Sequence, residues 1–397
     1  MHYALSVDDV QCAIALDNAL QRRDLYNLSL VSRSWRAITE PLLWREVPSL
    51  ITLLKLMPEG AWEERSVLKF DCQLTVLSSG RALEPNDWHP VLRKSRYVRQ
   101  LDVACQCDTK DWPAIQQAIL QCPPPPDCLP SLEYLRLKTA CCDFLGVDCW
   151  FAHKMDPEFI AILLFQPALR AVAVSFLHDE LVPRLSSLLA VCRRPVALDL
   201  DASHTPSPSR LSEIVRVLGD AGTQLSGISL RMDLPQDVCP TLLVELSRLP
   251  ALTALDVSIP NAAPEDEDVR VLPFNSPSFP ALRKLTLRTA PTDIVLQIVR
   301  AMRRCPLAHF EFCAGHIRAD EIAALCRVVH DHCDHAALTY FCLDSFLDDP
   351  VAETRVVRPL VAFKRLWYLR VLEDVLDVSE LAVVAEDDII WARPLEE

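Results

Sequence analysis

Glycine is scarce in this sequence: only 7 of the 397 residues are glycine, whereas 30 are proline. Neither a GxGxxG nor a GxxxxGK[ST] pattern occurs, so a glycine-rich loop that holds phosphates is disfavoured. GxSxG and HExxH, which mark serine hydrolases and zinc peptidases, are absent as well. We therefore expect no catalytic residue and no cofactor on this chain.

Positive charge is also in deficit, because 40 Lys and Arg stand against 54 Asp and Glu, a formal net charge of −14. Sequence-independent binding to nucleic acid depends on Lys and Arg neutralising phosphates, so this balance opposes it. Anionic membrane surfaces are disfavoured for the same reason. We expect neither nucleic acid nor membrane among the partners.

Long apolar runs are lacking too, and no segment is apolar over the length that a bilayer requires. The opening residues MHYALSVDDVQ carry acids where a secretory signal needs a basic and then apolar start. The 16 cysteines are then expected to be reduced thiols that act as small buried apolar groups. These features predict a cytoplasmic or nuclear protein.

The residues Arg22–Val47, RRDLYNLSLVSRSWRAITEPLLWREV, have the character of a motif. Asp24 is expected to cap a helix, since its carboxylate can accept the free N–H groups of the first turn. Pro41 suits the first position of a second short helix. Apolar residues at steps of three and four line one face of the first helix. These are Leu28, Val31, Trp35 and Ile38, while Leu25 and Leu30 form a second apolar surface.

A module of about 50 residues rarely supports its own core, so this surplus apolar surface must meet the rest of the chain or a partner. DLYNLSLVSRSW followed by PLLWREV resembles the F-box, in the form common in mushroom-forming fungi. The resemblance implies a helical module that docks on the Skp-type adaptor of a cullin–RING ubiquitin ligase. The implied adaptor-binding residues are Leu20, Leu25, Leu28, Val31, Trp35, Leu43 and Trp44.

The sequence before Asp24 departs from the F-box pattern. SVDDVQCAIALDNAL stands where F-boxes usually open with a Leu-Pro pair and an acidic-apolar helix. This departure keeps a second hypothesis open, in which the chain is a repeat-protein scaffold with a degenerate F-box and no ligase.

Short apolar-x-apolar cores recur along the rest of the chain at intervals of roughly 25 to 37 residues. PSLEYLRLKT, PALTALDVSI and PALRKLTLRT resemble the LxxLxL core of leucine-rich repeats. Segments of helical period, such as PTDIVLQIVRAMRRC, lie between most cores. The cores begin at Leu68, Leu101, Leu135, Val172, Leu198, Ile228, Leu255, Leu285, Phe310, Phe341 and Leu369.

We therefore expect an α/β fold in which an F-box-like helical module (1–50) precedes an irregular leucine-rich-repeat solenoid (51–397). Parallel strands would lie inside and helices outside, because single strand–helix units bury their apolar faces only by stacking. The C-terminal residues would form a cap. An ordinary doubly wound α/β domain is the alternative, since alternating strands and helices also build that fold.

The central residue of each core would point to the concave side of such a solenoid, since side chains alternate along a strand. Charged and small residues there suit a protein segment, although solubility explains them equally well. The resulting function is a substrate-recognition subunit of a Skp-cullin-F-box ligase that binds an unidentified target. The proposed target-binding residues are Asp102, Arg136, Asp199, Asp256, Thr286, Glu311 and Arg370, interspersed with Ala173, Ser229 and Cys342.

Two clusters contain metal-ligating residue types, but neither has the spacing of a known zinc site. CQC and CC pairs chelate poorly, and imidazoles at the end of a helix suit its dipole without a metal. We expect no metal. The clusters are Cys105, Cys107, Cys122, Cys128, Cys141, Cys142, Cys149 and His153, and His330, His332, Cys333 and His335.

Overall fold

A computed structural model of the chain divides it into two compact units, Met1–Val196 and Ala197–Glu397. The boundary expected after residue 50 stays a prediction. Among the described residues, no helix has the length and apolar character needed to cross a membrane. The described residues are 8–17, 19–69, 72–104, 112–138, 156–175, 181–202, 208–234, 239–259, 272–274, 278–302, 305–347, 359–360 and 362–371.

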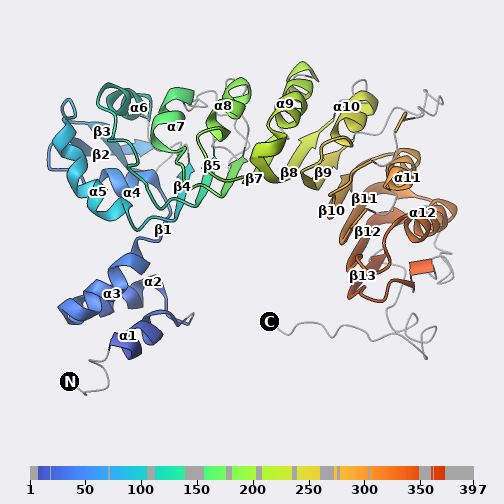
Figure 1. Ribbon diagram of the computed structural model, residues 1–397, viewed down its shortest axis with the longest axis horizontal. Helices are drawn as coiled ribbons and strands as arrows, with labels where there is room; N and C mark the ends of the chain where they lie inside the picture. Colours follow the sequence, from blue (N-terminus) through green and yellow to red (C-terminus); the bar gives the residue numbers. More distant parts are fainter. Residues whose placement is uncertain are drawn as a thin grey trace. The chain divides into compact units, whose positions relative to one another are not determined.

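Three helices open the first unit (Figure 1): α1 (Asp8–Ala15), α2 (Arg22–Val31) and α3 (Arg33–Leu43). The single helix expected from Asp24 to Ile38 is therefore wrong. Its path is interrupted at Ser32, whose backbone is extended with φ −161° and ψ 169°. Pro41 lies inside α3 rather than at the start of another helix.

The first unit then builds a parallel sheet of strand order β1-β4-β5-β6. Leu101 is paired in register with Val47 on one side and Leu135 on the other, and Leu135 is paired with Val172. Its elements are β1 (Glu46–Val47), α4 (Leu50–Leu54), η2 (Pro85–Trp88), α5 (His89–Ser95), β4 (Gln100–Ala104), α6 (Trp112–Gln121), β5 (Tyr134–Lys138), α7 (Pro157–Leu163), β6 (Ala171–Ser175), η3 (Val182–Arg184) and α8 (Leu185–Leu189).

One predicted core of the first unit belongs to a different sheet. Leu68 lies in β2 (Trp62–Lys69), which pairs antiparallel with β3 (Cys72–Ser79). Lys69 is paired with Cys72, and the two intervening residues are too few for the crossover that a parallel pair needs. The expectation that Leu68 starts a parallel strand is therefore wrong.

The second unit continues with strands in the order of the sequence, β7-β8-β9-β10-β11-β12-β13. The pairs from β8 to β13 are parallel. The elements are β7 (Val196–Ala202), α9 (Pro208–Asp220), η4 (Gly222–Gln224), β8 (Leu225–Asp233), α10 (Cys239–Leu246), β9 (Leu252–Ser258), β10 (Lys284–Arg288), α11 (Thr292–Ala301), β11 (His309–Ile317), α12 (Ala319–His332), β12 (Tyr340–Leu347) and β13 (Tyr368–Val371).

The core of each unit lies between its strands and the helices from α4 onward, which Figure 1 shows on one side of the strands. In β9 to β12, Leu255, Leu285, Phe310 and Phe341 are paired in register and all are buried. Fully burying one such side chain contributes about 1.5–3 kcal/mol. These stacked apolar side chains hold the strands, so the residues between them face away from the helices.

Candidate protein-docking site

The start of α2 is fixed by a hydrogen bond across its first turn. The backbone N–H of Gln21 donates to the Asp24 carboxylate over 3.0 Å. Gln21 is the N-cap and the helix begins at Arg22, so Asp24 is its third residue and not the N-cap that the sequence suggested. An acid in the first turn also suits the positive end of the helix dipole.

The joint between α2 and α3 depends on Ser32 and on a buried tryptophan. Ser32 Oγ accepts from the Trp35 N–H over 3.2 Å, which caps α3. Trp35 is only 4% exposed, and Thr39 Oγ1 one turn later donates to its carbonyl over 2.8 Å. Trp35 thus lies inside the helical module and holds it together, and its side chain is not available to a partner.

A packed helix precedes Asp24 even though the Leu-Pro start is missing. Ser34 Oγ on α3 donates to Oε1 of Gln11 on α1 over 2.6 Å. Gln11 and Ala15 are both buried, so one face of α1 is covered. Within SVDDVQCAIALDNAL, Asp8–Ala15 therefore supply a first helix to the module.

The helical module exposes an unusual number of apolar side chains. Eight large apolar side chains are exposed in the described part of the chain, and five of them belong to residues 10–31. Leu30 is 69% exposed and Val31 50%. Of the five, Tyr26 and Leu30 lie four residues apart on one face of α2, and apolar side chains that gather at a surface mark interaction sites. The five are Val10, Leu16, Tyr26, Leu30 and Val31.

The predicted adaptor-binding residues separate into three groups. Val31 is exposed, Trp35 is buried, and the other five are partly exposed. Sequence reasoning left Tyr26 and Leu30 out of the set, although both are more exposed than any predicted member. Their spacing of four residues on α2 was the available signal. The partly exposed residues are Leu20, Leu25, Leu28, Leu43 and Trp44.

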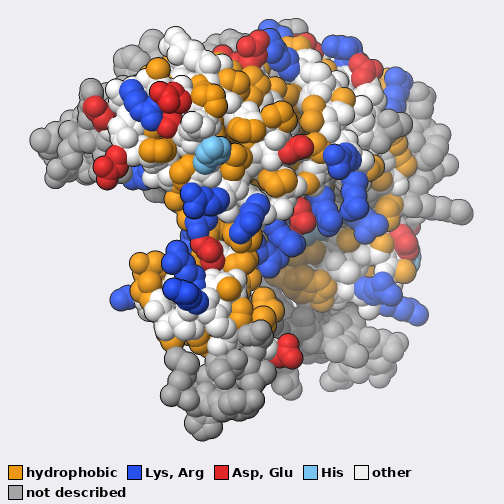
Figure 2. Space-filling model, turned by 60° about the vertical axis from the view of Figure 1, so that its left-hand side comes forward, with side chains coloured by type: hydrophobic (Ala, Val, Ile, Leu, Met, Phe, Trp, Pro, Cys, Tyr) orange, Lys and Arg blue, Asp and Glu red, His pale blue; other side chains and the backbone are white. Residues whose placement is uncertain are grey.

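Basic side chains lie beside Tyr26 and Leu30, and these are Arg22, Arg23, Arg36 and Lys94. Figure 2 shows Lys and Arg in several parts of the visible face. The first unit holds 21 Lys and Arg against 23 Asp and Glu, whereas the second holds 19 against 31. The excess acid of the chain thus belongs mainly to the second unit, and the module itself lies in the less acidic unit.

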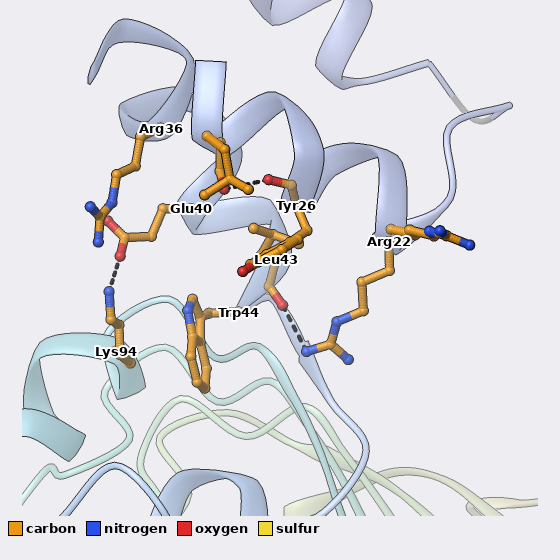
Figure 3. A pocket seen from close by; sticks show the side chains of 10 residues that line it. Arg22, Tyr26, Arg36, Glu40, Leu43, Trp44 and Lys94 are labelled. Carbon is orange, nitrogen blue, oxygen red and sulfur yellow. Dashed lines mark hydrogen bonds and ion pairs between the residues drawn. The ribbon is translucent and has the colours of Figure 1, made fainter. Parts of the chain in front are cut away.

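A pocket of about 650 Å³ lies between α2, α3 and α5 (Figure 3). Arg22 donates through Nη2 to the Leu43 carbonyl over 3.1 Å, which ties the start of α2 to the end of α3. Basic and apolar side chains both line the pocket, and Glu40 is the single acid among the lining residues. The lining residues are Arg22, Arg23, Tyr26, Ser29, Leu30, Arg36, Glu40, Leu43, Trp44 and Lys94.

Lys94 contacts both a charged and an aromatic side chain of this pocket. It forms an ion pair with Glu40 and lies over the Trp44 ring, with Nζ 6.0 Å from the ring centroid. Burial lowers the pKa of Lys94, and the nearby Arg36 and Arg96 lower it further. Glu40 is the carboxylate that offsets these charges. The pocket therefore suits a segment that carries both acidic and apolar side chains.

The sheet face away from the helices forms a second candidate surface. In the first unit, Arg136 Nη1 donates to Asp102 Oδ2 over 3.2 Å, so these two predicted residues neutralise each other. In the second unit, Asp256, Thr286, Glu311, Cys342 and Arg370 are paired in register. Thr286 is 1% exposed and Cys342 is buried, so neither side chain is open to a partner.

The register at β8 differs from the expected one. Arg231, not Ser229, lies beside Asp256, because Leu230 rather than Ile228 is paired with Leu255. Arg231 Nε donates to Asp256 over 3.0 Å, and its Nη1 lies 3.9 Å from Asp201. Asp201 is thus the β7 residue in contact with this row, and the predicted Asp199 lies two residues earlier on the same strand face, exposed.

An aromatic row that sequence reasoning missed runs beside the charged one. The rings of His309 and Tyr340 stack at 3.9 Å, and those of Tyr340 and Tyr368 at 4.3 Å. The exposed Trp367 meets Tyr340 edge to face at 6.2 Å. Burial and the nearby Lys284 lower the pKa of His309, which favours its neutral form.

No group of three or more His, Cys, Asp or Glu within the described ranges is arranged to hold a metal ion. His330 and His332 end α12, and His335 lies 2.7 Å from the His330 carbonyl, a distance that fits a hydrogen bond between protein groups. Of the cysteine cluster, Cys122 and Cys128 are described as free thiols. Outside the described residues lie Cys105, Cys107, Cys141, Cys142, Cys149 and His153.

The comparisons agree with the location of this site. No curated protein matches the chain. The sequence model of the F-box-like family matches residues 15–47, a stretch that spans the end of α1, all of α2 and α3, and β1. The helical module that carries the exposed apolar side chains is thus similar to an F-box-like domain.

Proposed function

We propose that this chain is the substrate-recognition subunit of a Skp-cullin-F-box type ubiquitin ligase. The observation that carries the proposal is a coincidence of position. The F-box-like match falls on the helices whose apolar side chains are most exposed, including Tyr26, Leu30 and Val31. Burying such side chains against an adaptor would be favourable at about 25 cal/mol per Å² of apolar surface.

The rest of the chain would form an irregular leucine-rich-repeat solenoid that binds the target protein. Sequential strand order within each unit, with helices on one side, supports stacked repeats over a doubly wound sheet. The sheet face of the second unit offers both charge and aromatic surface, through Glu311, Arg370 and Trp367. Such a mixed surface can recognise a protein segment by complementary charge.

In this function the chain acts by positioning, and we expect no catalytic step, cofactor or metal on it. Holding the adaptor at one end and the target at another raises the effective concentration of the target near the transferase. The ubiquitin-transferring chemistry then belongs to a separate subunit. We expect the protein in the cytoplasm or the nucleus, where such ligases act.

A scaffold with a degenerate F-box is the competing hypothesis, and the missing Leu-Pro start is its main support. The packing of α1 on α3, through Gln11 and Ser34, favours the ligase subunit instead. Titrating the purified chain with a purified Skp-type adaptor tests the choice. Saturable one-to-one binding with a Kd in the micromolar range or tighter is expected. Absence of binding at high micromolar concentrations of adaptor would contradict the ligase proposal and favour the scaffold hypothesis.

A further inference from the structure

A second pocket of the first unit, of about 440 Å³, lies where the chain enters the strands of the sheet. Residues just before β4, β5 and β6 form its base, with the loop before β7. Main-chain hydrogen bonds join these segments: Glu133 N–H to the Arg99 carbonyl, Arg170 N–H to Glu133 and Arg193 N–H to Pro167, at 2.8, 2.8 and 3.1 Å. The edge that carries the pocket is therefore held in place by its backbone.

Arginine dominates this edge. Four arginines line the pocket against two acids, Asp127 and Glu133, in a chain that is acidic overall. Glu133 lies 3.8 Å from Arg99, so one guanidinium already has a carboxylate beside it. Within the described residues, the other three guanidinium groups have no ion pair. The three are Arg170, Arg193 and Arg194, and all are exposed.

Unneutralised guanidinium groups that converge on one hollow favour an anion, because each presents parallel N–H donors that match the oxygens of a phosphate. Strands in a sheet are spaced by about 4.8 Å, so arginines from neighbouring segments can reach one ligand. The pocket volume falls in the range of small-molecule sites, about 300–1,000 Å³. Pro130, Pro167 and Ala168 also line the pocket and supply its apolar part.

We propose that this pocket binds a small anion with two or more phosphate groups, held by Arg170, Arg193 and Arg194. A diphosphate would match three guanidinium groups in charge and in number of acceptors. A long nucleic acid fits less well, because the first unit, with 21 Lys and Arg against 23 Asp and Glu, has no excess of positive charge to hold an extended polyanion. The proposal does not depend on the ligase function, since the pocket lies outside the F-box-like helices.

Isothermal titration of the full chain with pyrophosphate tests the proposal, at low and at physiological salt. Saturable binding that weakens as salt rises is expected. A tetraglutamate peptide of comparable charge serves as the competing ligand class. We expect it to bind at least about tenfold more weakly, because carboxylates spaced along a peptide cannot all reach one compact pocket. Equal or tighter binding of the peptide would assign the pocket to acidic protein segments instead.

Substitutions that should change the affinity for pyrophosphate in opposite directions separate an effect on binding from damage to the fold. Arg170→Gln and Arg193→Gln should each weaken pyrophosphate binding about tenfold. Glu133→Gln should strengthen it, because the change removes a repelling carboxylate and releases Arg99. Arg184→Gln is the matched control: it is an exposed arginine of the same unit that lies near Glu158 and outside the pocket. No detectable pyrophosphate binding, or equal effects of Arg170→Gln and Arg184→Gln, overturns the proposal.

Discussion

Lys94 on α5 and Glu40 on α3 form an ion pair that joins the F-box-like helices to the first strand–helix segment behind them (Figure 3). Both side chains are about three-quarters buried. Lys94 has no opposite charge besides Glu40 among the residues that line the pocket, and Arg36 and Arg96 both act on it unfavourably. The ion pair therefore holds α3 against α5, where Lys94 would otherwise be repelled by Arg36 and Arg96.

Glu40→Gln should lower the free energy of unfolding of the first unit by about 1–2 kcal/mol, since it leaves the charge of Lys94 without its partner. Adding Lys94→Gln to Glu40→Gln should recover part of this loss, because the lysine charge that Arg36 and Arg96 repel is then removed. A double-mutant cycle by denaturant unfolding measures the coupling. Additive effects of the two changes would show that the pair contributes nothing.

Trp35→Ala should loosen the helical module as a whole. Removing a buried aromatic side chain costs about 3–5 kcal/mol, and Trp35 is only 4% exposed. Amide hydrogen exchange over α1 to α3 should accelerate strongly. Exchange in β10 to β12, in the other unit, serves as the internal control and should stay as in the wild type.

His309 should make the second unit sensitive to acid. Its pKa is lowered in the folded state, whereas the unfolded imidazole titrates near 6.5. The unfolded chain therefore binds more protons as the pH falls through about 6.5, and the free energy of unfolding decreases. Lys284 and Tyr340 face this imidazole together with Glu311, whose attraction opposes the shift in part.

Comparing unfolding of the wild type and His309→Gln at pH 8 and pH 5.5 isolates this contribution from that of the carboxylates. The wild type should lose more stability than the variant over this interval. An identical loss in both proteins would mean that His309 does not contribute.

The strand positions were predictable from the sequence because each core repeats a buried apolar-x-apolar pattern. Leu255, Leu285 and Phe310 are paired in register as that pattern implies. Leu68 satisfied the same pattern yet entered a hairpin, since the pattern describes burial and not the direction of the neighbouring strand. The register of β8 was hidden for a related reason: Ile228, Leu230 and Met232 alternate and are all buried, so the apolar-x-apolar pattern fits at two positions two residues apart.

The docking site was harder to read, because helical period finds an apolar face without saying whether the chain itself covers it. Trp35 and Val31 lie on the same predicted face, but one is buried and the other exposed. Ser32 explains the difference. It interrupts the helix between Val31 and Trp35, so the two residues do not share a helical face. Serine occurs both inside helices and at their caps, so the sequence alone did not reveal this break.

The central claim is that the exposed apolar side chains of the F-box-like helices dock a Skp-type adaptor. Leu30→Gln and Ile162→Gln form a matched pair: each residue is the penultimate one of a short helix in the first unit, and the side chains are 69% and 43% exposed. Adaptor affinity should fall at least about tenfold with Leu30→Gln and stay within about twofold with Ile162→Gln. Equal affinity of the wild type and Leu30→Gln for the adaptor, or equal losses in both variants, would contradict the account.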